Sequence, residues 1–135
     1  MEHGRRNIIA GGIVIFIAAI GGFALGFTVE NLFKDGFYAL TLPRLLVKAG
    51  HSHGMPMAFY NLIIGVMVDR LALTEKGKKN LSILSLGAFI MPLGLFLRGL
   101  TGGSTTFIPV VMIGAICFLA STAIMLKGAI ARKAF

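Results

Sequence analysis

Long apolar runs, separated by short polar segments, dominate the chain. The first run, residues 8–29, holds no Asp, Glu, Lys or Arg over 22 residues. At a rise of about 1.5 Å per residue, a helix of that length crosses the roughly 30 Å hydrocarbon core of a bilayer. Residues 81–97 form a run of 17 residues and residues 107–126 a run of 20, each bounded by polar or basic residues. These three runs predict membrane-spanning helices.

A fourth run, residues 54–68, has only 15 apolar or weakly polar residues before Asp69 and Arg70. That is short for a span, so the helix must recruit residues, either upstream at His51 and His53 or downstream at Asp69 and Arg70. No β-barrel alternation is visible. We therefore predict an all-α integral membrane protein: a four-helix up-down transmembrane bundle that forms one membrane domain over residues 1–135, with approximate spans 8–29, 52–70, 81–98 and 107–126.

The connection between the first two spans, residues 31–50, is the longest and is not a polar linker. It suggests a short amphipathic helix with Thr41 as its N-cap and Pro43 in its first turn. Its apolar and basic positions are Leu42, Leu45, Leu46 and Val47 with Arg44 and Lys48. Such a helix either lies in the membrane interface or runs directly into the second span. We favour the short interfacial segment.

Small residues and one proline mark contacts within the bundle. Gly22 and Gly26 have small-xxx-small spacing, which lets another helix approach closely. We favour packing within the bundle over a homo-oligomer contact for this pair. Pro92 removes one backbone hydrogen bond from the third helix and is expected to kink it.

Composition and charge fit the bilayer. The chain is 56% hydrophobic and 13% charged, with a net charge of +8. Nine basic residues fall on the side shared by the termini and the connection between spans two and three: Arg5, Arg6, Arg70, Lys76, Lys78, Lys79, Lys127, Arg132 and Lys133. The opposite side holds four: Lys34, Arg44, Lys48 and Arg98. The positive-inside rule therefore predicts cytoplasmic termini, in the inner (plasma) membrane of a prokaryote. Anionic headgroups explain the charge, and no nucleic-acid partner is expected.

One segment at the predicted outer mouth of the second span has candidate metal ligands: His51, His53, Met55 and Met57. Thioethers favour Cu(I), and imidazole suits copper, zinc or haem iron. In an extended segment, alternate residues face one side and all four could meet one ion. In a helix, His51 shares a face with Met55, while His53, Met57 and Asn61 line another. The sequence leaves both geometries open.

Other polar residues are expected at the same depth: Glu30, Tyr60, Asn61 and Arg98. Together they could form a polar cluster around the histidines. In the alternative interpretation, Arg98 snorkels towards the headgroups and Glu30 pairs with a loop lysine, so that no site forms.

The His51-Ser52-His53-Gly54 segment, with the later Asn61 and Gly65, resembles haem-copper oxidase subunit I and nitric oxide reductase. In those proteins, such histidines bind metal. The resemblance covers residues 51–65 alone. A complete oxidase or reductase site needs more histidines, and the only other one here, His3, is predicted on the cytoplasmic side. A haem would need an axial partner such as Met91 or Met112, or a site shared between subunits, so haem ranks below copper or no metal.

Two functional hypotheses follow. The first is a small accessory protein whose outward His/Met site handles copper or haem, or supports a respiratory complex. The second is a non-catalytic scaffold or subunit of a larger membrane complex. No nucleophile-base set and no phosphate loop supports a hydrolase or kinase, so an enzyme is the less favoured interpretation.

Overall fold

The computed structural model describes residues 3–32 and 41–131, and for residues 24–32 it describes the backbone alone. All regular structure in these ranges is helical, as the apolar runs predict. The elements are α1 (Arg5–Leu32), α2 (Thr41–Met67), the short 3-10 helix η2 (Val68–Arg70), α3 (Glu75–Gly87), α4 (Ile90–Leu100), the 3-10 helix η3 (Thr105–Phe107) and α5 (Ile108–Ile130).

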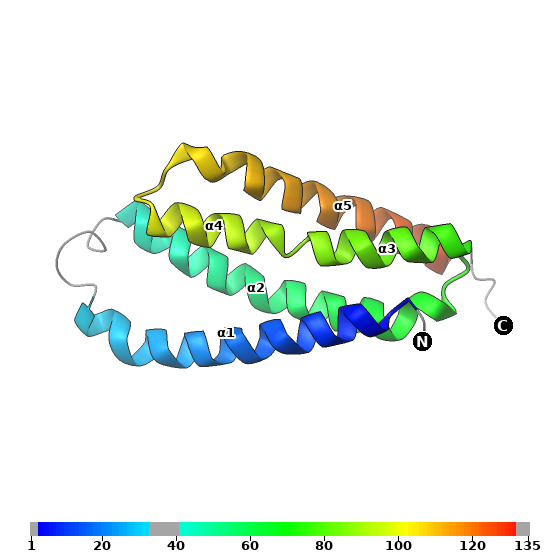
Figure 1. Cartoon of the computed structure of the whole chain (residues 1–135), viewed down its shortest axis with the longest axis horizontal. Helices are drawn as coiled ribbons and strands as arrows, with labels where there is room; N and C mark the ends of the chain where they lie inside the picture. Colours follow the sequence, from blue (N-terminus) through cyan, green and yellow to red (C-terminus); the bar gives the residue numbers. More distant parts are fainter. Residues whose placement is uncertain (1–2, 33–40, 132–135) are drawn as a thin grey trace.

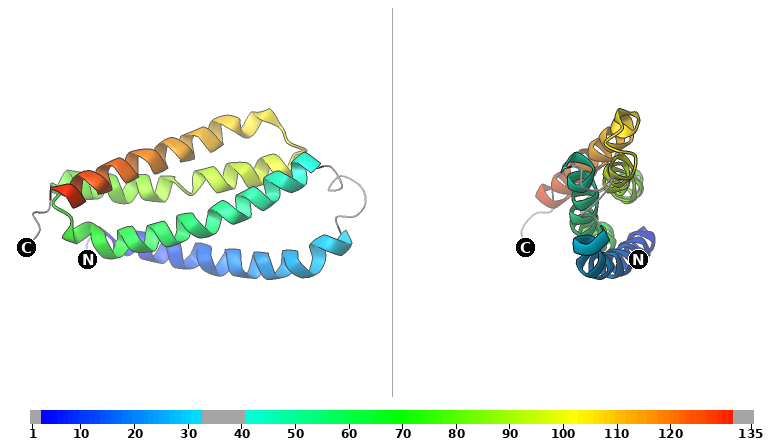
Figure 2. Two further views of the ribbon diagram at one scale, coloured as in Figure 1. Left: turned by 180° about the vertical axis from the view of Figure 1, so that it is seen from behind. Right: turned by 90° about the vertical axis from the view of Figure 1, so that its left-hand side faces the viewer.

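The helices run alternately up and down, with α3 and α4 in line as one interrupted rod (Figure 1). We call the end that holds Arg5, Arg70 and Ile130 the basal end, and the end that holds Thr41, Leu100 and Thr105 the distal end. The end-on view in Figure 2 shows α2 between α1 and the α3/α4 rod, with α5 packed on that rod. The predicted all-helical up-down arrangement is confirmed, and α2 is its central helix.

The predicted short interfacial segment before the second helix is wrong. Residues from Thr41 onwards belong to α2, which continues without a break to Met67 and contains Pro56 in its interior. Pro43, Leu46 and Val47 are buried. They pack on α4, where an added Cβ on Gly99 would lie 2.5 Å from Cγ2 of Val47. The apolar face that suggests an interfacial helix is satisfied by a neighbouring helix instead.

The third rod is interrupted between α3 and α4, at Ala88 and Phe89. Pro92 has no N–H to donate to the carbonyl of Ala88, four residues earlier. That carbonyl accepts from the backbone N–H of Met91 instead, at 3.2 Å. The kink predicted from Pro92 is thus present one turn before the proline, and it takes the form of a break.

Glycines set the distance between helices. An added Cβ on Gly4 would collide with the carbonyl of Gly65, and one on Gly11 would lie 2.8 Å from the carbonyl oxygen of Ala58. An added Cβ on Gly50 would lie 2.9 Å from the carbonyl oxygen of Pro92 on α4. Backbones in contact at small residues are typical of helices that pack in lipid, where apolar side chains gain little by association.

The outer surface of α1 and α5 is apolar. Exposed large side chains include Ile13, Phe16, Ile17, Ile20 and Phe23 on α1, and Ile113, Ile116, Leu119 and Ile130 on α5. Among the described residues, three stretches are long and apolar enough to cross a membrane: Arg5–Phe23, Glu75–Leu100 and Thr105–Ile130. α2, which carries two histidines and an asparagine, is not among them. α2 packs against α1, α3 and α4 along one side, so it has less exposed surface than a helix with no neighbours.

Candidate functional site

The segment from His51 to Met57 is helical, which settles the geometry that the sequence leaves open. His51 is half-buried and faces α1, where an added Cβ on Gly22 would lie 3.0 Å from Cε1 and Nε2 of its ring. His53 is exposed, and its Nδ1 lies 2.8 Å from the carbonyl oxygen of Ala49. Since a carbonyl only accepts, Nδ1 must be the donor in this contact. Met57 is buried.

The four predicted metal ligands therefore do not meet at one point. At about 100° per residue, His51 and His53 lie on nearly opposite faces of α2. The described residues contain no group of three or more His, Cys, Asp and Glu side chains that could hold a metal ion. Met91 lies at the contact between α4 and α5, against Gly114, and Met112 is exposed on α5. Neither methionine is placed to share a haem with His51, which faces α1.

The predicted polar cluster is also separated. Arg98 lies at the distal end, where its Nε donates to the carbonyl oxygen of Ser104 at 3.1 Å. Its neighbour Gly99 packs on Val47, which precedes Asn61 by 14 positions, or about 21 Å along the helix axis. The side chain of Glu30 and the surroundings of Gly26 lie outside what the structure describes. The expectation of equal depth fails because α2 begins at Thr41, so Tyr60 and Asn61 lie towards its basal end.

Asn61 belongs instead to a buried polar network that links three helices. Its Oδ1 accepts from Nδ2 of Asn7 at 2.8 Å, and its Nδ2 donates to the carbonyl oxygen of Ser85 at 2.9 Å. Nδ2 of Asn7 also donates to the carbonyl oxygen of Ser82, whose hydroxyl donates to Oδ1 of Asn7. Asn7, Asn61 and Ser85 are fully buried. The spacing of Ser82 and Ser85, three residues apart and so on one helix face, is the sequence signal that could have found this network.

Tyr60, next to Asn61 in the sequence, connects α2 to α5. Its hydroxyl donates to Oγ of Ser121 at 2.9 Å, and its ring lies edge-on to that of Phe118, with centroids 5.1 Å apart. At the basal surface, His3 and Lys78 both contact the exposed Glu75 carboxylate, at 2.8 and 2.9 Å. The buried polar network, the Tyr60 contacts and the Glu75 contacts together link α1, α2, α3 and α5 in the basal half of the bundle.

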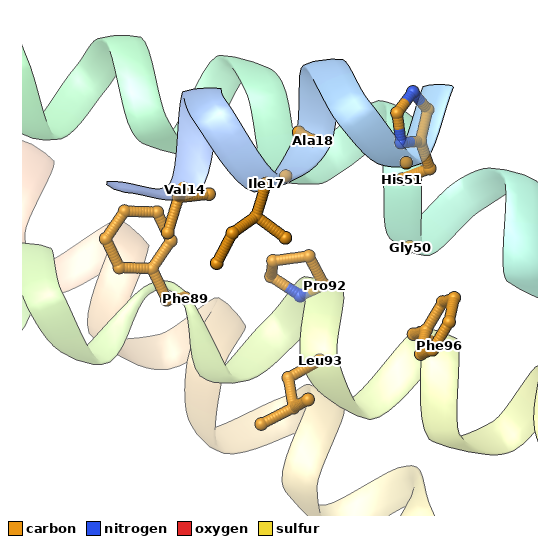
Figure 3. A pocket seen from close by; sticks show the side chains of 11 residues that line it. Val14, Ile17, Ala18, Gly50, His51, Phe89, Pro92, Leu93 and Phe96 are labelled. Atoms are coloured by element: carbon orange, nitrogen blue, oxygen red, sulfur yellow. The ribbon is translucent and has the colours of Figure 1, made fainter. Parts of the chain in front are cut away.

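A hollow opens between α1, α2 and α4 in the middle of the bundle (Figure 3). Its volume is about 540 Å³. The lining is apolar apart from one imidazole, and consists of Val14, Ile17, Ala18, Gly21, Gly50, His51, Gly54, Phe89, Pro92, Leu93 and Phe96. We call it the α1/α4 groove. Figure 3 places His51 and Phe96 towards one end of the groove and Phe89 towards the other.

A second feature lies on the exposed side of α2. Arg44, Lys48, Ser52 and His53 are all exposed, and we call them the polar strip. At about 100° per residue they span the exposed half of α2, with Lys48 and Ser52 on adjacent parts of it and Arg44 and His53 at its two edges. Pro56, also exposed, cannot supply the N–H that normally bonds to the carbonyl of Ser52. Nearer the basal end, the exposed residues of α2 are apolar and include Phe59, Ile63 and Val66. The polar strip therefore interrupts an otherwise apolar exterior.

No protein-family model matches the sequence, and comparison with curated proteins and with solved structures finds no match. Function must therefore be inferred from the polar strip, the buried polar network and the α1/α4 groove.

Proposed function

We propose that the chain is a non-catalytic subunit of a larger membrane complex, and that it docks onto an acidic membrane partner through the polar strip of α2. In this proposal the chain crosses the inner membrane four times, with the basal end in the cytoplasm. The basal end carries many exposed basic residues, and such residues are enriched on the cytoplasmic side of membrane proteins, which supports that orientation. They include Arg5, Arg6, Arg70, Lys76, Lys79 and Lys127.

The observation that carries the proposal is the distance of the polar strip from the distal end of α2, which corresponds to hydrocarbon depth if α2 crosses the membrane. Lys48 lies seven residues and His53 twelve residues after Thr41, which is about 10 and 18 Å along α2. Long basic side chains such as those of Arg44 and Lys48 can reach the headgroups by snorkelling. Ser52 and His53 are too short to do so. The Ser52 hydroxyl and His53 Nδ1 each bond the carbonyl oxygen of Ala49, which leaves Nε2 of His53 without a hydrogen bond to the described residues. Polar groups that face hydrocarbon are unfavourable, and in membrane proteins they are normally covered by a partner or line a polar cavity.

The chemistry of the strip indicates the kind of partner. Two cations, a hydroxyl and an imidazole favour a transmembrane helix that carries a carboxylate. A second copy of this chain is a poor fit. Two copies related by a two-fold axis normal to the membrane would place Arg44 and Lys48 beside the same residues of the other copy, and like charges repel strongly in a low-dielectric setting.

A photo-crosslinking amino acid at Ser52, introduced in native membranes, tests this proposal. We expect one defined heterologous product whose cross-linked peptide contains Asp or Glu within a membrane span. Lys48→Glu should reduce its yield at least fivefold by placing like charges together. The same label at Leu119, on the apolar face of α5, is the matched control and should give no defined protein product.

Two results would overturn the proposal. One is a Ser52 product with twice the mass of this chain, which would make the strip a homodimer surface. The other is labelling of lipid alone at both Ser52 and Leu119, which would show that the strip faces the bilayer.

A further inference from the structure

The α1/α4 groove is a true hollow, and two of its three glycines are not needed for helix contact. Added Cβ atoms on Gly21 of α1 and Gly54 of α2 would meet nothing within 4 Å. By contrast, added Cβ atoms on Gly11 and Gly50 would meet the backbone of the neighbouring helix. The space beside Gly21 and Gly54 is therefore available to a ligand. Its volume of about 540 Å³ lies within the range of about 300–1,000 Å³ usual for small-molecule sites.

The groove is reachable from the side of the bundle. Two of its lining residues, Ile17 of α1 and Leu93 of α4, are more than half exposed. If the bundle lies in a bilayer, this side faces hydrocarbon, and a molecule dissolved in the membrane can enter without crossing water. An apolar opening of this kind selects an occupant with a long hydrocarbon portion.

His51 restricts the chemistry of the occupant further. It is the only side chain of the lining that can form strong hydrogen bonds, and its ring makes no hydrogen bond to another part of the chain that the structure describes. It lies ten residues, or about 15 Å, from the distal end of α2. A charged phospholipid headgroup would have to leave the membrane surface to reach that depth. A neutral head with a carbonyl oxygen can accept a hydrogen bond from the imidazole N–H there.

We infer that the α1/α4 groove binds a prenylated quinone. Its carbonyl accepts a hydrogen bond from His51, its flat ring lies beside the ring of Phe96, and its isoprenoid chain follows α1 past Ile17 towards Phe89 (Figure 3). Aromatic rings favour such stacked or edge-on contacts. The inference concerns binding alone and does not depend on the proposed docking surface, since His51 faces α1 whereas His53 belongs to the exposed strip.

A photoreactive azidobenzoquinone with a decyl side chain tests this site on the full-length chain in phosphatidylcholine nanodiscs. We expect saturable labelling of peptides from α1, α2 and α4, displaced by decylubiquinone. Gly21→Leu fills the groove and should lower labelling at least fivefold. Gly12→Leu is the matched control: Gly12 is on the same helix, is equally open and does not line the groove, so labelling should not change.

A second pair of variants tests the hydrogen bond. His51→Phe keeps a flat ring but cannot donate, and should weaken binding of decylubiquinone about fivefold, the factor expected for one lost hydrogen bond. His53→Phe should leave binding unchanged. Labelling that does not saturate, or that falls equally in Gly21→Leu and Gly12→Leu, would overturn the inference. So would a photoreactive phosphatidylcholine that labels the groove and is not displaced by decylubiquinone, because the groove would then hold ordinary lipid.

Discussion

Asn61 is completely buried, yet both polar atoms of its side-chain amide have partners. Its Nδ2 bonds the carbonyl oxygen of Met57 as well as that of Ser85, and its Oδ1 accepts from Asn7. One residue thus joins α1, α2 and α3 within the apolar bundle. Inter-helix hydrogen bonds of this kind add a modest stability each, but a donor left unpaired in such a place is unfavourable.

We therefore expect Asn61→Ala to lower the free energy of unfolding by about 1–2 kcal/mol, because it removes bonds to two helices and leaves Asn7 with an unpaired N–H. Reversible denaturant titration in detergent measures the change. Ser52→Ala, at an exposed position of the same helix, should alter stability by less than about 0.5 kcal/mol. Equal stabilities of the two variants would contradict a structural role for the buried network.

At the scale of whole elements, the apolar runs predict three of the helical rods well, because lipid-facing helices must be apolar throughout. Thus residues 8–29 lie within α1 and residues 107–126 nearly coincide with α5. α2 is harder to delimit. Its first ten residues show an apolar face and two exposed cations, a pattern that is the same whether the apolar face meets lipid or α4. The local sequence marks a helix that starts near Thr41, but whether that helix continues into the second span depends on packing against α4.

The incorrect extent predicted for the second helix also leads to an incorrect arrangement of the candidate site. Residue types and spacing identify His51, His53 and Asn61 as unusual for an apolar helix. They do not reveal which neighbours each of these residues faces. Because α2 begins early, His51 faces the groove, His53 faces outwards and Asn61 joins the basal network. Gly22 likewise meets the His51 ring, whereas backbone contacts between α1 and α2 occur at Gly4 and Gly11.

Gly99 tests whether the first turns of α2 are packed or free. An added side chain there would meet Val47, whose backbone nitrogen would lie 2.7 Å from the new Cβ. Overpacking of this kind is typically destabilising by about 1–3 kcal/mol, so Gly99→Leu should unfold at lower denaturant concentration. Gly12→Leu, where nothing lies within 4 Å, is the control. If both variants are equally stable, residues 41–50 do not pack on α4.

At the scale of the whole molecule, the bundle has a basic basal end, helices that pack at glycines, and two features in the distal half of α2. The polar strip faces outwards and the α1/α4 groove faces α1, so one helix can contact a protein partner and a lipophilic ligand at once. Both proposals require that α2 crosses the membrane, although it is not among the three stretches that are long and apolar enough to do so by themselves. Its packing against α1, α3 and α4 along one side is the physical reason that it can do so, because only the other side needs to suit lipid or a partner.

Single cysteines at Arg6, Lys79 and Thr101, in a Cys117→Ala background, test that crossing most directly. All three positions are at the surface, near the two ends of the bundle. With an impermeant thiol reagent in intact cells, Thr101 should label, whereas Arg6 and Lys79 should label only after the cytoplasmic side is opened. Labelling of Arg6 and Lys79 from opposite sides would contradict the account, because the chain would then cross the membrane an odd number of times between them.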